Sequence, residues 1–310
     1  MLRFPQSKPM TQEISLTSAN RGLTAMEWRQ LHTSLQWVYR GKVPDEGRGH
    51  FEGNCGGSAW YILQGEGVVQ HDKREFRAKK GHWLFANMGP HYRDFTRNAE
   101  IISVRFYLEW PDGQPLFFHQ TGLVLSGVKH SGLLRTAKAM ERIVYVNGRR
   151  IFTNTEFMNE RLMFPAYIDV TGALLQWAKA LYDALIAEGI KPSLERFEDS
   201  RVVRALRVLD SWPFHQSFSL SELVKNTGVS QAQLNRLFIT RLGLTPHQYF
   251  ERRRLRHADR NVLLPYLSIK EVALDLGFRH VSNFSAWFKQ SMGMNPNERR
   301  DTVPRPTSIM

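Results

Sequence analysis

The sequence predicts an α+β fold of two domains, in which a β-rich domain and its following helices precede an all-α domain. Over residues 33–108, short runs rich in Val, Ile, Tyr, Phe and Trp alternate with glycines, as in antiparallel strands joined by tight turns. From residue 132 onward, apolar residues instead recur at the three-to-four spacing of a helix. The length of 310 residues fits two domains of ordinary size.

The β region is expected to be a sandwich or a small barrel. Its strands, for example GSAWYILQ and EIISVRFYLEW, are short and follow one another at intervals of about ten residues. Glycines fall between them, where the chain must turn. The β pattern ends at the segment from Pro111 to Pro115.

Two helices are expected after the strands, over residues 132–146 and 166–188. In the second helix one apolar stripe contains Leu174, Trp177, Ala178, Leu181 and Leu185. This stripe either packs on the β domain or pairs with a second subunit, and both hold if the helix is apolar on more than one side. Gly189 suits the end of the helix, and residues 191–200 are expected to be a polar linker.

The composition excludes several classes of protein. Hydrophobic residues make up 42% of the chain and charged residues 23%, so a folded core is expected and a disordered polycation is excluded. No apolar run approaches the ~18–20 residues of a membrane-spanning helix, and the first residues lack the apolar core of a signal peptide. With Cys55 as the single cysteine, no intrachain disulfide is possible, and a cytoplasmic location is expected.

Positive charge is concentrated in the last third of the chain. The formal net charge is +13, and residues 201–310 hold nine of the 13 excess positive charges. A basic region beside a nearly neutral one is typical either of a module that binds a polyanion or of a solvated basic surface.

The basic region contains an internal repeat. One copy runs from Ser219 to Gln248, and the other runs from Ser268 to Glu298 with one extra residue in its turn. The landmarks that the copies share are Ser219/Ser268, Glu222/Glu271, Gly228/Gly277, Phe238/Phe288, Gly243/Gly293 and Pro246/Pro296.

Each copy predicts two short helices separated by a glycine turn. In the first copy, Ser219-x-x-Glu222 is a capping-box pattern, Gly228 suits a left-handed helix end, and Ser230-x-x-Gln233 caps a second helix. The second copy has the same order of signals, and after each copy a proline opens a further helix. This order predicts a helix-turn-helix unit, whose second helix enters the major groove of DNA.

The segment between the copies, Gln248 to Leu264, is expected to be a helix that holds the two units at a fixed separation. It contains Arg252, Arg253, Arg254, Arg256 and Arg260. The positive charge of this region predicts a salt-sensitive affinity for any DNA.

These motifs resemble the DNA-binding domain of the AraC/XylS family of bacterial transcription regulators. The likeness is carried by SxxxLNRLFxxxLGxTPxxYxxxxRLxxA from Ser230 to Ala258 and by SIKEVALDLGFxxxSNFSxxFKxxxGxxP from Ser268 to Pro296. The resemblance implies a domain of seven helices, with two recognition helices that enter successive major-groove faces about one helical turn apart.

Residues 48–108 resemble, more loosely, the cupin-like effector domain of the same family, through GEGVVQHDKREFRAKKGHWLF and the GPHY after it. This resemblance implies a cupin-like β-barrel that binds a small molecule, often a sugar, and dimerisation helices where residues 132–188 lie. Two departures occur in the second repeat. Ala286 stands where the family often has arginine, which favours phosphate contacts there, and Pro296 is followed by Asn297-Glu298 without the usual aromatic residue.

The expected DNA contacts lie on the faces of the two recognition helices opposite their apolar anchors. In the first helix they are Ala232, Gln233, Asn235, Arg236 and Thr240, and in the second they are Arg279, His280, Ser282, Asn283, Ser285 and Lys289. Arg236 is the best candidate for base readout, since a guanidinium can bond both O6 and N7 of guanine.

The residues expected to line an effector site are polar or aromatic and can point inward by strand alternation. They are Arg48, His50, Trp60, His91, Tyr92, Ser103 and Arg105. Aromatic faces beside charged donors suit a sugar or a small acid. His50-x-Glu52, His71, His82 and His91 include no HxH pair, so no metal site and no cofactor are expected.

The sequence therefore predicts a ligand-responsive, DNA-binding transcription regulator without enzymatic activity. The expected boundaries are 1–128 for the effector domain, 129–198 for a helical linker and dimerisation segment, 199–302 for the double helix-turn-helix domain and 303–310 for a tail. Its expected partners are double-stranded DNA, a small-molecule effector such as a sugar or its derivative, a second copy of the chain and, for an activator, RNA polymerase; no membrane is expected.

Two alternatives stay open at this point. One is a metal-dependent cupin enzyme with a DNA-binding appendage, and the other is a regulator controlled by a protein partner. No GxSxG, phosphate-binding loop or HExxH motif is present to support a hydrolase or a nucleotide-binding enzyme.

Overall fold

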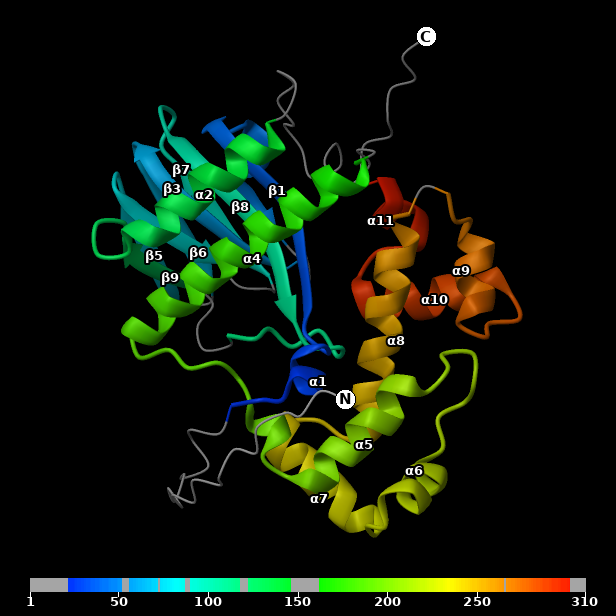
Figure 1. Ribbon diagram of the computed structural model, residues 1–310. Helices are drawn as coiled ribbons and strands as arrows, with labels where there is room; N and C mark the ends of the chain where they lie inside the picture. Colours follow the sequence, from blue (N-terminus) through cyan, green and yellow to red (C-terminus); the bar gives the residue numbers. More distant parts are fainter. Residues whose placement is uncertain are drawn as a thin grey trace, which may run out of the picture.

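The protein has a β domain followed by a helical domain, as Figure 1 shows. The computed structural model describes residues 22–51, 56–71, 73–86, 90–117, 122–145, 162–264 and 266–301. A short helix, α1 (Ala25–Trp28), precedes the first strand. The α+β fold class predicted from the sequence is confirmed.

The β domain consists of two antiparallel sheets. The larger sheet has the order β1-β8-β3-β6-β9, and the smaller has the order β2-β7-β4-β5. The strands are β1 (His32–Lys42), β2 (Gly49–Phe51), β3 (Gly57–Gln64), β4 (Glu66–His71), β5 (Arg74–Lys79), β6 (His82–Ala86), β7 (His91–Phe95), β8 (Glu100–Glu109) and β9 (Gly122–Ser126).

The expectation of a closed cupin-like barrel is wrong for the described strands. Closure requires hydrogen bonds between edge strands, but β1 pairs only with β8 and β9 only with β6, so the described strands form a two-sheet sandwich. The sequence also gave no signal for β9, because GLVLS is short and lies beyond the turn where the alternating pattern ends.

The larger sheet is buried on both faces. One face packs on the smaller sheet through residues such as Trp60, Ile62 and Ile101. The opposite face, which includes Ile102 and Phe106, packs on two helices. Burial on both sides explains why β8 carries apolar residues on both faces and shows little alternation.

The two covering helices are α2 (Ser131–Val144) and α4 (Phe164–Ala187), close to the expected ranges. The predicted stripe of α4 lies in the core of the β domain, where Trp177 packs edge-on against Phe106 with ring centroids 4.7 Å apart. This confirms that the stripe packs on the sheet. No helix in the described part of the chain is long and apolar enough to cross a membrane.

The helical domain contains the seven helices that the family resemblance implies, in the part from residue 200 to 301 that the structure describes. They are α5 (Ser200–Ser211), α6 (Leu220–Thr227), α7 (Gln231–Leu242), α8 (Pro246–Val262), α9 (Ile269–Asp275), α10 (Val281–Met292) and α11 (Pro296–Asp301). Figure 1 shows α8 between the α5–α7 group at its N-terminal end and the α9–α11 group at its C-terminal end. Tyr249 and Phe250 of α8 belong to the first core, and Ala258 and Val262 belong to the second.

Candidate nucleic-acid interface

The first helix-turn-helix unit is α6 and α7, and its ends are fixed by local hydrogen bonds. The Ser219 hydroxyl accepts from the Glu222 amide, and the Ser230 hydroxyl accepts from the Gln233 amide, each at 3.3 Å. Gly228 ends α6 in the left-handed conformation, with φ of 68°. The short turn therefore sets the angle at which α7 leaves α6.

The second unit, α9 and α10, repeats this construction with one difference. Ser268 and Glu271 form a complete capping box, whereas His280, at the N-cap of α10, makes no side-chain capping bond. Gly277 has φ of +78°, and a Cβ there would lie 2.7 Å from the His215 carbonyl oxygen. A glycine is therefore required in this turn for two reasons, its backbone conformation and the close approach of a neighbouring segment.

The outer face of α7 presents the residues that the sequence suggested. Leu234 and Phe238 are fully buried in the first core. Ala232, Arg236 and Thr240 are exposed, while Gln233 and Asn235 are half-buried. The sequence reasoning missed Ile239, which is 54% exposed on this helix. Helical spacing places Ile239 on the same face as Ala232 and Arg236, so periodicity alone could have found it.

The outer face of α10 is likewise open. Phe284 and Phe288 are fully buried, and the Trp287 indole donates to the Glu251 carboxylate at 3.3 Å. The exposed residues are Arg279, His280, Ser282, Asn283 and Lys289, and Ser285 is half-buried. The two recognition helices thus both keep a polar face free of the core, and contact of these residues with DNA stays a prediction.

The arginines of α8 are used differently from what the sequence suggested. Arg253 is buried, donates to the carbonyls of Leu209 and Asp210, and lies 4.8 Å from the Phe214 ring centroid. Arg254 donates to the Leu276 carbonyl at 2.7 Å. These two guanidinium groups therefore tie α8 to the cores on its two sides.

Two more α8 arginines point away from the helical domain toward the β domain. Arg256 and Arg260 both donate to the carboxylate of Glu109, the last residue of β8, which is 1% exposed. Four of the five α8 arginines thus have intramolecular partners, and Arg252 is exposed. The positive charge of these four arginines is therefore engaged in contacts within the chain.

The residues expected to line an effector site separate into two groups. Trp60 and Ser103 pair across β3 and β8 and lie on the face of the larger sheet that packs on the smaller one. Arg105 shares this face by alternation, and the Trp37 indole donates to the Ser103 hydroxyl at 3.0 Å. His91 lies on the matching inner face of the smaller sheet, on the same side of β7 as the buried Phe95.

The inward orientation expected for His50, Tyr92 and Arg48 is not found. His50 and Tyr92 are paired across β2 and β7 on the outer face, with ring centroids 5.0 Å apart. Arg48 donates to the Phe95 carbonyl and lies 3.4 Å from the Asp94 carboxylate, so it serves to hold the sheet.

Sequence reasoning missed Arg93, which lies on the inner face of the smaller sheet. It is 6% exposed and donates to the Gly47 carbonyl at 2.8 Å. Its guanidinium stacks over Phe51 at 3.4 Å and faces Trp60 at 5.1 Å. Burial, followed by the positive charge of Arg105, lowers the pKa of Arg93 to about 9. Two like charges therefore face each other between the sheets.

The scattered histidines do not converge. Within the described ranges, no group of three His, Cys, Asp or Glu side chains is placed to hold a metal ion. Glu52, one of the candidates in the sequence, lies outside the described residues.

Comparison with known proteins shows similarity to transcription regulators. Residues 223–302 match the family described as a helix-turn-helix domain. The chain is 34% identical over 111 residues to the probable transcriptional regulator LumQ of Photobacterium leiognathi, a match that covers 34% of this chain and 45% of LumQ. It is 22% identical over 247 residues to the virulence regulon transcriptional activator VirF of Yersinia enterocolitica, covering 78% of this chain and 88% of VirF.

A crystal structure of apo ToxT from Vibrio cholerae is similar at a TM-score of 0.49 and 12% identity, covering 88% of this chain and 98% of ToxT. The chain spans less than half the length of LumQ. The family match to the helix-turn-helix region, the two complete units and the regulator relatives agree with the motif from Ser230 to Pro296. The helix-turn-helix domain of this chain is that of the AraC/XylS family of transcription regulators.

Proposed function

We propose that this chain regulates transcription by reading promoter DNA with α7 and α10, under the control of a small molecule bound in the β domain. The observation that carries the proposal is the pair of matched helix-turn-helix units built on one helix. Because α8 packs into the cores of both units, it holds the recognition helices at a fixed separation. Such a pair suits two successive major-groove segments on one side of DNA.

The two recognition helices have different roles in this proposal. In α7, Arg236 reads guanine, and Ile239 offers an apolar contact to a thymine methyl group. In α10, Ser282 and Asn283 reach base edges near the start of the helix. Lys289, two turns further along the same face, contacts phosphate and positions the unit without specifying sequence.

The effector that we propose is a small organic acid bound between the sheets. Arg93 and Arg105 place two positive charges there, and the lowered pKa of Arg93 reflects burial and then their repulsion. A carboxylate between them would relieve that repulsion and accept charge-assisted hydrogen bonds. Phe51 and Trp60 supply ring faces for the rest of the molecule. Of the two classes that the sequence suggested, this arrangement favours an acid over a neutral sugar.

A second copy of the chain is the proposed partner of α4. Five large apolar side chains, Phe164, Ile168, Leu175, Tyr182 and Ile186, are exposed on one face of this helix. They lie within a narrow arc at helical spacing, separate from the stripe that packs on the sheet. Exposed apolar faces of this kind mark association sites. A dimer would present two helix-turn-helix pairs to repeated half-sites, with promoter DNA in the bacterial cytoplasm and, for an activator, RNA polymerase as further partners.

The test of DNA reading is an in vitro selection with the full chain against random duplex DNA. We expect enrichment of two short conserved blocks about one helical turn apart. The selected duplex and a scrambled duplex of equal composition are then compared across a salt series. Equal affinity for the two duplexes would contradict sequence-specific reading.

The test of the effector class is a thermal-shift screen that compares organic acids with neutral sugars. A ligand at 100 times its dissociation constant stabilises the folded chain by about 2.7 kcal/mol. The shift should vanish in Arg93→Gln and persist in Arg77→Gln, a matched control because Arg77 is exposed on β5 of the same sheet. An acid that stabilises Arg93→Gln as well as the wild type would refute the assignment.

A further inference from the structure

The β domain contacts the helical domain through a short turn at the end of β8. This turn, residues 109–113, we call the interdomain turn. Glu109 accepts hydrogen bonds from Arg256 and from Arg260, the latter at 2.8 Å. Asp112, which is 3% exposed, pairs with the buried Arg196 at 3.0 Å. Two buried carboxylates of one turn thus hold arginines from α8 and from the segment that leads into α5.

The turn is shaped for this contact. Gly113 has φ of +81°, and a Cβ there would lie 2.8 Å from Nε of Arg256. The Arg256 guanidinium also lies 5.4 Å from the ring centroid of Tyr107, on β8. Two backbone hydrogen bonds close the turn. The Gly113 amide donates to the Trp110 carbonyl, and the Trp110 amide donates to the Gln114 carbonyl, each at 2.8 Å. Movement of this turn would therefore change the contacts of Glu109 with Arg256 and Arg260, which hold α8.

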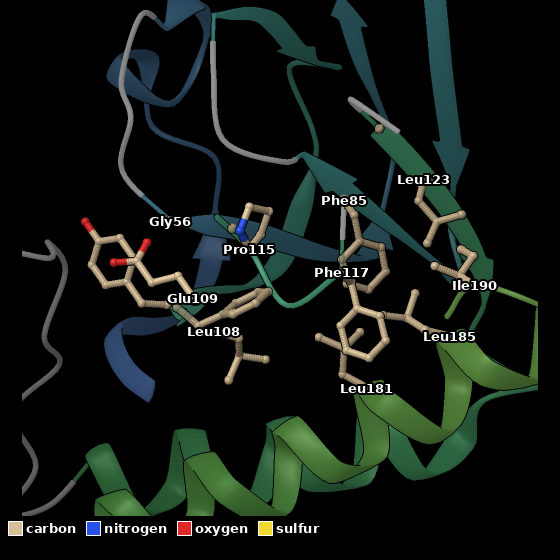
Figure 2. A pocket seen from close by; sticks show the side chains of 14 residues that line it. Gly56, Phe85, Leu108, Glu109, Pro115, Phe117, Leu123, Leu181, Leu185 and Ile190 are labelled. Carbon is tan, nitrogen blue, oxygen red and sulfur yellow. The ribbon is translucent and has the colours of Figure 1, made fainter. Parts of the chain in front are cut away.

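An apolar pocket of about 70 Å³ lies directly against the interdomain turn, between β8 and α4. Figure 2 shows Leu108, Glu109 and Pro115 toward one end, and Leu181 and Leu185 of α4 along one wall. The pocket thus touches the turn itself at Glu109 and the chain on both sides of it, just before it at Leu108 and just after it at Pro115.

This pocket is separate from the proposed effector site between the sheets. Arg105 faces the smaller sheet, whereas Phe106 and Leu108 face the helices, so the two sites lie on opposite faces of β8. Their chemistry differs as well. Among the described residues that line the pocket there is no Lys, Arg or His, and Glu109 is the one charged side chain.

The charge of Glu109 is already balanced by the two α8 arginines. A cation gains nothing there, because it would compete with Arg256 and Arg260. A carboxylate would meet Glu109 and no basic partner on the pocket wall. The occupant that the wall selects is therefore uncharged and apolar.

We propose that this β8–α4 pocket binds a small uncharged apolar molecule, and that the bound molecule stabilises the closed interdomain turn. A molecule in the pocket adds contacts to Leu108 and Pro115 in the closed arrangement, and a ligand shifts a population toward the arrangement it contacts better. The pocket is thus a second regulatory input, and its biological role rests on the proposed function as a regulator.

The test uses two small aromatic probes with the same ring and different charge. Toluene is neutral, and benzylammonium carries a positive charge, which the two arginines between the sheets also repel. Each is titrated into the full chain, and the neutral probe is expected to bind at least about tenfold more tightly, a difference of about 1.4 kcal/mol. Leu123→Phe and Ile190→Phe, which each fill the pocket, should weaken the neutral probe at least about tenfold.

Val128→Phe is the control, because Val128 is 87% exposed outside the pocket and should leave binding unchanged. Circular dichroism verifies that each variant is folded. Hydrogen exchange of the wild type should slow at the Trp110 and Gly113 amides when the neutral probe is bound. If a filling variant does not fold, this measurement alone tests whether the bound molecule stabilises the turn.

The proposal is overturned if both probes bind equally, if neither folded filling variant weakens the neutral probe, or if exchange at the interdomain turn does not slow. None of these assays contains DNA. A failed DNA selection would therefore remove the proposed function and leave the pocket, whereas failed probe binding would remove the pocket and leave DNA recognition intact.

Discussion

Among single residues, Arg236 is the one that we propose reads a base from the first unit. It is exposed on α7 beside a fully buried core face, so its replacement should not disturb folding. Arg236→Ala is expected to reduce operator affinity by about 1–3 kcal/mol and to relax one base position. Fluorescence anisotropy on the selected duplex and its single-base variants measures both effects. Lys289→Ala is the comparison, since it should weaken all duplexes equally; a uniform loss for Arg236→Ala would argue against base reading.

His32 gives the β domain a specific acid sensitivity. Burial, followed by the charges of Arg260 and Arg256, lowers the pKa of His32 from 6.5 to about 4. The unfolded chain therefore binds more protons than the folded chain in this interval. The stability contribution is complete above the unfolded value of 6.5 and declines as the pH falls toward 4.

His32→Gln removes this titration. The variant is expected to lose less free energy of unfolding than the wild type between about pH 7 and about pH 5, as measured by urea denaturation at each pH. Equal losses in the two proteins would show that His32 does not titrate in this way.

Residue alternation also explains where sequence reasoning about the effector site failed. The sequence placed His50 and Tyr92 inward, whereas their neighbours Phe51 and Arg93 are the inward residues. A shift of one residue reverses every side chain of a strand. In short strands with polar residues on both faces, such as HYRDF, the sequence does not fix which parity is buried.

Among the elements, α7 depends on its N-terminal cap. Ser230→Ala removes the hydroxyl that accepts from the Gln233 amide and is expected to lower the free energy of unfolding by about 1 kcal/mol. Ser217→Ala is the control, because Ser217 is exposed in the loop before α6. Chemical denaturation of both variants measures the difference. Equal stability of the two variants would mean that the turn geometry alone positions α7.

The contact between β8 and α8 depends on Glu109. Glu109→Gln leaves Arg256, which is largely buried, without its carboxylate, and breaking a buried pair in this way costs roughly 3–5 kcal/mol. We expect a lower unfolding midpoint and a larger radius of gyration in small-angle scattering as the domains separate. Glu66→Gln, at an exposed carboxylate, should change neither. An unchanged radius in Glu109→Gln would show that other contacts hold the domains.

At the scale of the whole molecule, the proposed dimer uses the outer face of α4. Leu175→Glu places a charge in the exposed apolar face and should convert a dimer to a monomer in sedimentation, with loss of cooperative binding to paired half-sites. Lys138→Glu, at an exposed position on α2, is the control and should leave the sedimentation of the dimer unchanged. A wild-type chain that sediments as a monomer at all concentrations would exclude this interface.

The sequence by itself determined the α+β division, the two covering helices and the helix-turn-helix repeat, because each depends on local signals. Periodicity marks the apolar faces, serine caps begin the helices, and glycines end them. The resemblance to the AraC/XylS family rests on the same local motifs, since they fix the shape of the recognition units.

Only the tertiary structure decided which charges are free. The sequence shows five arginines in one helix, but Arg253, Arg254, Arg256 and Arg260 are occupied by groups 22 to 151 residues away along the chain. The open sandwich, the inward Arg93 and the interdomain turn likewise depend on which faces meet across the fold. Partners so distant leave no periodic pattern in the sequence. Part of the positive charge that suggested DNA binding, on Arg256 and Arg260, instead holds the two domains together.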